Sequence, residues 1–337
     1  MSKKNLLSKA IFNNKLASKF LTKRSQKNIH ILAYHRIVDK LSSDYMFNPE
    51  TFSATTSDFD EQMKYVSKNF NVINFAQLES GIINNNLKDN SVIVTFDDGY
   101  YDNYSIAMPI LNKYNIGATV FLATDYIENG NLFWFDLVSG FLKTYTGSKL
   151  DLESIDSVFN FDSVSKHEAF KLVGRKLKTS DDSLRVNLLT EIHDRYNFTI
   201  HDNHYQQAKP MNWDNVLEMS KHDIEFGSHS KSHCFLNCID DESLKYELND
   251  SKLIIETKTG KDVNSFCYPA GVTDLKIQNM VNLCGYYFGV GYRHGVNDIR
   301  NVELYDLYRE HVELDVNFDL FRANITLPEI FMRKVTS

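Results

Sequence analysis

Three short segments place acidic, histidine and turn-forming residues at spacings that can build a hydrolytic site. Asp97 and Asp98 directly follow the apolar run 92–96 and precede Gly99. Two adjacent carboxylates after a buried strand are costly unless something keeps them charged. A turn at Gly99 can direct both toward one cavity, where one carboxylate binds a cation and the other takes a proton. The alternative is a pair of turn-forming aspartates, because Asp-Gly is a common turn dipeptide.

The second segment, residues 227–233 (GSHSKSH), carries two histidines four positions apart. His229 and His233 can converge on one ion if the residues between them turn. With Asp98 they would form a His-His-carboxylate site with open positions for water and substrate. Zinc is the default ion for these ligands, and Co²⁺, Ni²⁺ or Fe²⁺ also suit them. The alternative is two exposed histidines in a serine-rich turn.

The third segment, Tyr268 to Gly271, contains Pro269 and fixes a turn directly after a short apolar run. That geometry can form one wall of a pocket. All three segments come at the carboxyl ends of predicted strands, where α/β barrels place their active-site groups.

Strand and helix patterns alternate through the part of the chain that carries these segments. Apolar runs at 29–34, 92–96 and 118–122 predict strands, and the stripes at 57–70 and 109–114 predict helices between them. This alternation predicts an α/β fold with parallel strands and crossover helices.

From about 129 to 209 the alternation stops, and the sequence becomes richer in charge and mostly helical in pattern. We interpret this stretch as a helical insertion, because the alternating pattern resumes after it. Phe133, Trp134 and Phe135 could stack on sugar rings in such an insertion. Aromatic residues at helical spacing more often belong to a core, which is the interpretation we favour.

Composition excludes some classes of function. The net charge of -7 over 337 residues argues against nucleic acid as the main partner, because phosphate binding requires an excess of Lys and Arg. Cys234 and Cys238 lie beside histidines, but four scattered cysteines are better explained as reduced thiols than as a zinc site. No apolar run reaches the ~18 residues of a transmembrane helix.

Residues 1–28 form a distinct basic segment with no acidic residue before Asp39. Its lysines interrupt every apolar stretch, so we expect no cleavable signal peptide and a cytoplasmic location. Its apolar residues recur at helical spacing, which is typical of a basic amphipathic helix. Such a helix either lies on an anionic membrane surface, here the inner membrane face, or packs on the folded domain.

The three segments together resemble the polysaccharide deacetylase (NodB-homology) family. The matching motifs are TFDDGY at 95–100, GSHSKSH at 227–233 and YPAG at 268–271, in this order. AYHR at 33–36 and DLYR at 306–309 resemble the branch of the family that acts on poly-N-acetylglucosamine. The resemblance covers roughly residues 29 to 325, and we expect the deacetylase domain to occupy 29–335.

The resemblance implies a distorted (β/α) barrel of the NodB-homology type with a helical insertion. It implies that Asp97 is the general base and that Arg309 orients it or pairs with its charge. It also implies a metal site and a substrate-binding wall, in which the backbone after Tyr268 helps to hold the oxyanion. The implied metal ligands are Asp98, His229 and His233, and the implied substrate-binding residues are His35, Tyr268, Pro269 and Gly271.

Two departures from the family pattern affect the predicted site. Cys267 and Tyr268 occupy the region where the family often has an arginine before its proline. The late Leu-x-x-His that supplies the general acid has no clean counterpart. His311, His294 and His35 are the candidates for that role.

The expected function is metal-dependent hydrolysis of an N-acetyl or other N-acyl group from an amino sugar in a polysaccharide or glycan precursor. One alternative is a deacylase of a polyprenyl-phosphate-linked aminosugar, a lipid-linked sugar, at the cytoplasmic face. An O-acetyl esterase acting on a glycan uses the same groups. A carbohydrate-binding protein with an inactive site is disfavoured, because Asp97, Asp98, His229 and His233 are all present.

Overall fold

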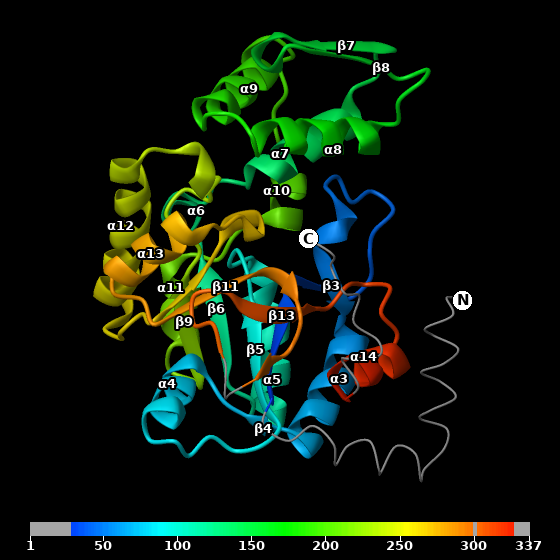
Figure 1. The fold of residues 1–337 in the computed structure, drawn as a ribbon. Helices are drawn as coiled ribbons and strands as arrows, with labels where there is room; N and C mark the ends of the chain where they lie inside the picture. Colours follow the sequence, from blue (N-terminus) through cyan, green and yellow to red (C-terminus); the bar gives the residue numbers. More distant parts are fainter. Residues whose placement is uncertain (1–27, 299–301, 327–337) are drawn as a thin grey trace.

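The computed structural model describes residues 28–298 and 302–326, and its centre is a closed barrel of parallel strands (Figure 1). Neighbouring strands follow the order β1-β13-β11-β10-β9-β6-β5, and β5 pairs back onto β1 to close the ring. The predicted (β/α) barrel is therefore confirmed. The barrel strands are β1 (Asn28–Tyr34), β5 (Ser91–Phe96), β6 (Ala118–Leu122), β9 (Ile224–Ser228), β10 (Ser265–Cys267), β11 (Phe288–His294) and β13 (Leu307–His311).

Alternation along β5 decides which side chains face the barrel interior. Ile93 belongs to a cluster that collects alternate residues from most of the barrel strands, so it points inward. Thr95 and then Asp97 continue the same row, whereas Val94 and Phe96 pack outward against helices. The strand thus aims Asp97 into the mouth of the barrel.

Helices surround the barrel and close one end of it. Phe75 and Leu78 of α4 join the interior cluster, so this helix covers the end opposite the functional segments (Figure 1). The apolar stripes of the other helices pack on the outer faces of the strands. The helices around the barrel, α4 included, are α3 (Thr56–Asn69), α4 (Phe75–Ile83), α5 (Met108–Tyr114), α11 (Trp213–Met219), α12 (Asp241–Thr259), α13 (Leu275–Leu283) and α14 (Phe318–Thr326).

A separate layer, placed above the barrel in Figure 1, is formed by part of the chain between β6 and β9. It has its own apolar core, which includes Trp134, Phe141 and Leu188, and Phe235 from the segment after β9 packs into this core. The region is mostly helical, in agreement with its sequence pattern. It also contains an antiparallel pair of strands that the sequence does not indicate. Its elements are α6 (Thr124–Asn129), α7 (Trp134–Thr144), β7 (Lys149–Leu152), β8 (Ser157–Asn160), α8 (Lys166–Leu177), α9 (Ser183–Asp194) and α10 (Asp202–Ala208).

Short strands flank the barrel. β12 pairs antiparallel with the start of β1, β4 pairs with the start of β5, and β2 pairs with β3 in a small separate sheet. The flanking strands are β2 (Arg36–Val38), β3 (Phe52–Thr55), β4 (Asn71–Val72) and β12 (Asn297–Asp298).

Within the described residues, none of the helices is long and apolar enough to cross a membrane. The predicted basic segment 1–28 lies outside the described residues except for Asn28.

Candidate active site

Asp98, His229 and His233 converge at the carboxyl ends of β5 and β9. Asp98 Oδ1 lies 3.4 Å from His229 Nε2 and 3.3 Å from His233 Nε2. All three side chains are buried, and their ligand atoms lie within 4.8 Å of one another. In the barrel, β5 and β9 are separated by a single strand, β6. The fold therefore brings these two segments together although they lie far apart in the sequence.

The orientation of His229 suits a metal ligand. Its Nδ1 lies 2.8 Å from the carbonyl oxygen of Cys267, and because a carbonyl only accepts, Nδ1 carries the proton. Nε2 then directs a lone pair toward Asp98 and His233. One carboxylate oxygen and two imidazole nitrogens fit a divalent transition-metal ion such as zinc, and Asp98, His229 and His233 are the residues that would hold it.

The backbone of the segments that carry the candidate metal ligands is held in an unusual conformation. Asp98, Ser230 and His233 have φ angles of 74°, 61° and 52°, which lie in the left-handed region that favours glycine. Strain of this kind persists only where the surroundings enforce it, and it is concentrated at functional sites. Here Ser230 Oγ accepts a hydrogen bond from His233 N, and Ser228 Oγ accepts one from Ser230 N.

Glu247 of α12 fixes the loop between the two histidines. Its Oε2 accepts hydrogen bonds from Lys231 N at 2.8 Å and Ser232 N at 2.9 Å, and its Oε1 accepts one from Ser232 Oγ at 2.8 Å. Glu247 is buried, so this carboxylate acts as an internal clamp on the loop. Nothing in the sequence marks Glu247 as a site residue, because a glutamate on an amphipathic helix normally faces solvent.

Asp97 forms a two-pronged ion pair with Arg309 of β13. The Asp97 oxygens accept hydrogen bonds from the two terminal nitrogens of Arg309 at 2.7 and 2.8 Å. Burial alone would raise the pKa of Asp97, but the charge and hydrogen bonds of Arg309 outweigh it and hold that pKa well below its usual range. Arg309 also donates to the carbonyl oxygen of Gly291 and to Thr95 Oγ1, which fixes its position in the barrel.

These groups share a cleft of about 370 Å³ at the mouth of the barrel. His35 lines this cleft, and its Nε2 lies 3.7 Å from Asp97 Oδ2. Tyr268 and Gly271 also line it, whereas Pro269 is buried and does not. The Tyr268 hydroxyl donates to the carbonyl oxygen of Tyr305 and is therefore already engaged. Trp134 and Phe135, for which the sequence favours a place in the core over stacking on sugar rings, line the cleft as well. Lining residues that the sequence does not single out are Asn48, Glu50, Thr51, Lys178, Ala270 and Tyr292.

The three candidate acids occupy different environments. His35 lies in the cleft with 30% of its side chain exposed. The His311 ring lies against that of Tyr292, with centroids 3.9 Å apart and planes inclined by 35°, and burial holds the pKa of His311 well below its usual value. His294 lies against His311 at 4.9 Å. The structure brings His35, but neither His294 nor His311, to the cleft wall.

A comparison with protein families identifies the family of this chain. The family model described as polysaccharide deacetylase matches residues 84–154 and 174–289, which is more than half of the chain. The chain belongs to the polysaccharide deacetylase family. The residues left unmatched between the two segments, 155–173, fall in the layer above the barrel and include β8.

A curated relative matches this chain at low sequence identity. YxkH of Bacillus subtilis (strain 168) is 21% identical over 234 residues, which cover 69% of this chain and 56% of YxkH. The match thus spans little more than half of YxkH.

Solved structures extend the likeness over most of the chain. The deacetylase PplD of Streptococcus pyogenes, in complex with acetate, has a TM-score of 0.59 and 18% identity, covering 87% of this chain and 95% of PplD. BC0361, a polysaccharide deacetylase from Bacillus cereus, has a TM-score of 0.58 and 18% identity over 89% of this chain and 69% of BC0361. IcaB from Ammonifex degensii has a TM-score of 0.52 and 14% identity over 89% and 96%. At these identities the likeness supports the fold.

Proposed function

We propose that this protein is a metal-dependent hydrolase that removes an N-acyl group, in the first instance N-acetyl, from an amino sugar of a glycan. The observation that carries the proposal is the placement of two carboxylates with different partners in one cleft. Asp98 with His229 and His233 offers a ligand set for a cation, and Asp97 with Arg309 offers an ionised carboxylate beside it.

The residues of the cleft divide the work of amide hydrolysis between them. A divalent ion, when bound, supplies Lewis acidity and lowers the pKa of a bound water. Asp97 stays ionised beside the ligand set, so it is the proposed acceptor of the proton from the attacking water. Arg309 holds both Asp97 oxygens and prevents the carboxylate from turning away.

Two further groups in the cleft complete the proposed reaction. Ala270 follows Pro269 in a left-handed conformation and lines the cleft, so its backbone N–H is the proposed donor to the oxyanion. His35 is the proposed donor of a proton to the leaving nitrogen, because it lies in the cleft beside Asp97 and is partly exposed.

Family membership supports an acetylated glycan as the class of substrate, and zinc is the metal that we propose first.

We further propose that the protein acts in the cytoplasm and that the basic segment 1–28 contacts the inner membrane face. Sedimentation with anionic vesicles at low salt tests this contact. If the full chain sediments no more than a variant lacking residues 1–27, the contact is refuted.

Elemental analysis of the purified protein tests the metal site directly. We expect about one transition-metal ion per chain in the wild type, with the ion lost in Asp98→Ala and His233→Ala. His222→Ala removes an exposed histidine outside the cleft and serves as the matched control, which should keep the ion. Acetate release from N-acetylated oligosaccharides then tests the activity. A wild-type protein that stays metal-free after loading with zinc, cobalt or nickel would overturn the proposal in favour of a carbohydrate-binding protein.

A further inference from the structure

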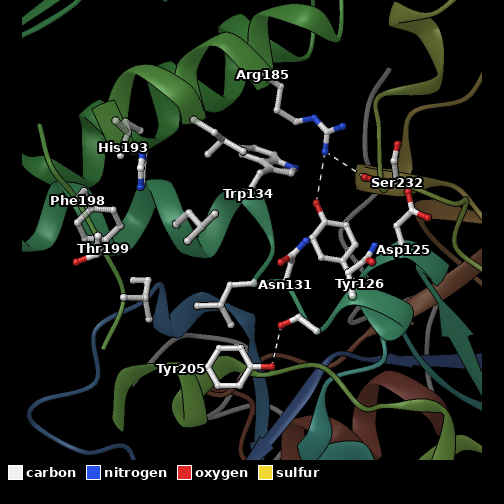
Figure 2. Close-up of a pocket in the computed structure, with 17 residues that line it drawn as sticks. Asp125, Tyr126, Asn131, Trp134, Arg185, His193, Phe198, Thr199, Tyr205 and Ser232 are labelled. Atoms are coloured by element: carbon white, nitrogen blue, oxygen red, sulfur yellow. Dashed lines mark hydrogen bonds between the residues drawn. The ribbon is translucent and has the colours of Figure 1, made fainter. Parts of the chain in front are cut away.

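A second cavity, of about 570 Å³, lies between the α6–α7 connection and helices α9 and α10 (Figure 2). Its volume falls within the range of about 300–1,000 Å³ that is typical of small-molecule sites. The residues around it come from the layer above the barrel and from the loop that carries the metal ligands. None of the proposed steps of hydrolysis uses this cavity.

The cavity adjoins the active-site cleft. Trp134 lines both spaces. Its neighbours Phe133 and Phe135 contact the His233 ring, with centroid distances of 5.5 and 5.6 Å. Ser232, which precedes His233, lines the cavity as well. A ligand in the cavity would therefore lie next to the substrate group that reacts in the cleft.

The cavity combines an apolar surface with polar groups. Its lining includes the aliphatic side chains of Leu137 and Leu189. It also includes Asn131, Tyr126 and Arg185 (Figure 2). An apolar lining with a few fixed polar groups is the usual composition of a site for a small, amphiphilic ligand.

One polar group of this lining still requires a partner. Trp134 is only 6% exposed, and its Nε1 has no hydrogen-bond partner among the described residues. Figure 2 shows the indole nitrogen on the edge of the ring that faces Arg185 and Tyr126. Arg185 itself is engaged, because it donates to the Tyr126 hydroxyl and to the carbonyl oxygen of Ser232. A buried N–H without an acceptor costs free energy, so a ligand that brings an oxygen to Trp134 is favoured.

We propose that this cavity binds a second sugar unit of the same glycan whose neighbouring unit reacts in the cleft. The inference rests on the proposed function and names the substrate as an oligomer. A sugar ring offers an apolar C–H face for the aliphatic and aromatic lining, and its hydroxyl or acyl oxygens offer acceptors for the indole N–H. A hydrocarbon chain would fill the apolar part but leave Trp134 Nε1 buried without an acceptor, which favours the sugar.

The fluorescence of Trp134 reports on binding in the cavity and in the adjoining cleft, because this residue lines both. The chain has two tryptophans, and Trp213 lies on α11, where it donates to Glu128 outside the cavity. In a Trp213→Phe background, Trp134 is the single fluorophore. We expect N-acetylglucosamine oligomers of two to six units, tested as β-1,4 and β-1,6 series, to change its emission. At least one series should bind about tenfold more tightly than the monomer, which corresponds to about 1.4 kcal/mol.

Two substitutions on α9 separate the cavity from the cleft. Leu189→Phe fills part of the cavity, whereas Val186→Phe makes a similar change on the exposed face of the same helix. We expect Leu189→Phe to abolish the tenfold gain from chain length while leaving monomer binding unchanged. Val186→Phe should keep the gain. Equal behaviour of the two variants, or equal binding of monomer and oligomers in both series, overturns the inference.

The same titration distinguishes failure of the inference from failure of the proposed function. Chain-length-dependent binding that Leu189→Phe removes, in a protein that releases no acetate, supports the cavity and refutes the hydrolase. Acetate release at equal kcat/KM from monomer and oligomers overturns the cavity and leaves the hydrolase standing.

Discussion

Replacing Glu247 should weaken metal binding at the proposed site without changing any of the proposed ligands. Glu247→Ala removes an acceptor for three hydrogen bonds from Lys231 and Ser232. At the lower limit of about 1.5 kcal/mol for each bond to a charged acceptor, the free energy of unfolding should fall by about 4.5 kcal/mol. Because the loop carries His233 in a left-handed conformation, metal affinity should also fall by about 10- to 100-fold, as for other groups that orient ligands.

Competition with a chelator of known affinity measures the metal binding, and chemical denaturation measures the stability. Glu247→Gln should show a smaller loss, because its amide oxygen can still accept from both backbone N–H groups. Glu256→Ala is the matched control, since Glu256 lies on the same helix and accepts a hydrogen bond from Val263 N, away from the metal loop. Wild-type metal affinity in Glu247→Ala would refute the reasoning, because the clamp would then be unnecessary for the loop conformation.

Three other substitutions test the charges of the site. Asp97→Asn should abolish acetate release yet keep one metal ion per chain, since asparagine takes no proton; near-normal turnover would contradict the assignment of the base. Arg309→Met should raise the pKa of Asp97, move the acid limb of kcat/KM to higher pH and cost about 3–5 kcal/mol of stability, as measured by pH profiles and denaturation. An acid limb at the wild-type pH would argue against the pairing. Burial raises the pKa of Asp136 from 3.8 to about 7, despite the nearby charge of Arg36. The folded protein therefore holds a proton that the unfolded chain has released, so the free energy of unfolding should fall as pH rises across that interval. Asp136→Asn should flatten this slope in denaturation experiments at several pH values, and an unchanged slope would rule out Asp136 as its cause.

The barrel could be predicted from the sequence because its signals are local. The continuous apolar run before Asp97 indicates a strand buried on both faces, and alternation with helices indicates parallel pairing. The same local pattern places Asp97, Asp98 and the two histidines at strand ends. Their meeting in space follows from the barrel, because β5 and β9 have their carboxyl ends at the same mouth.

The supporting contacts could not be predicted, because each joins residues that no periodic pattern relates. Glu247 resembles any solvated glutamate of an amphipathic helix until α12 is packed against the metal loop. The hydrogen bond from Tyr100 to Asp136 joins the TFDDGY motif to the helical layer, although Asp136 lies in a stretch that reads as ordinary α-helix. Trp134 was interpreted as core, which its burial supports, yet it also lines both cavities.

The position of β13 has a consequence for how the protein is made. This strand lies between β1 and β11, and it is the last barrel strand in the sequence. A ribosome synthesises the chain from the amino end, so Asp97 emerges more than two hundred residues before Arg309. Until β13 inserts, the barrel wall is open and the carboxylate has no guanidinium partner. Completion of the barrel and completion of the Asp97 ion pair are therefore one event, and a nascent chain that stalls before residue 307 would lack both.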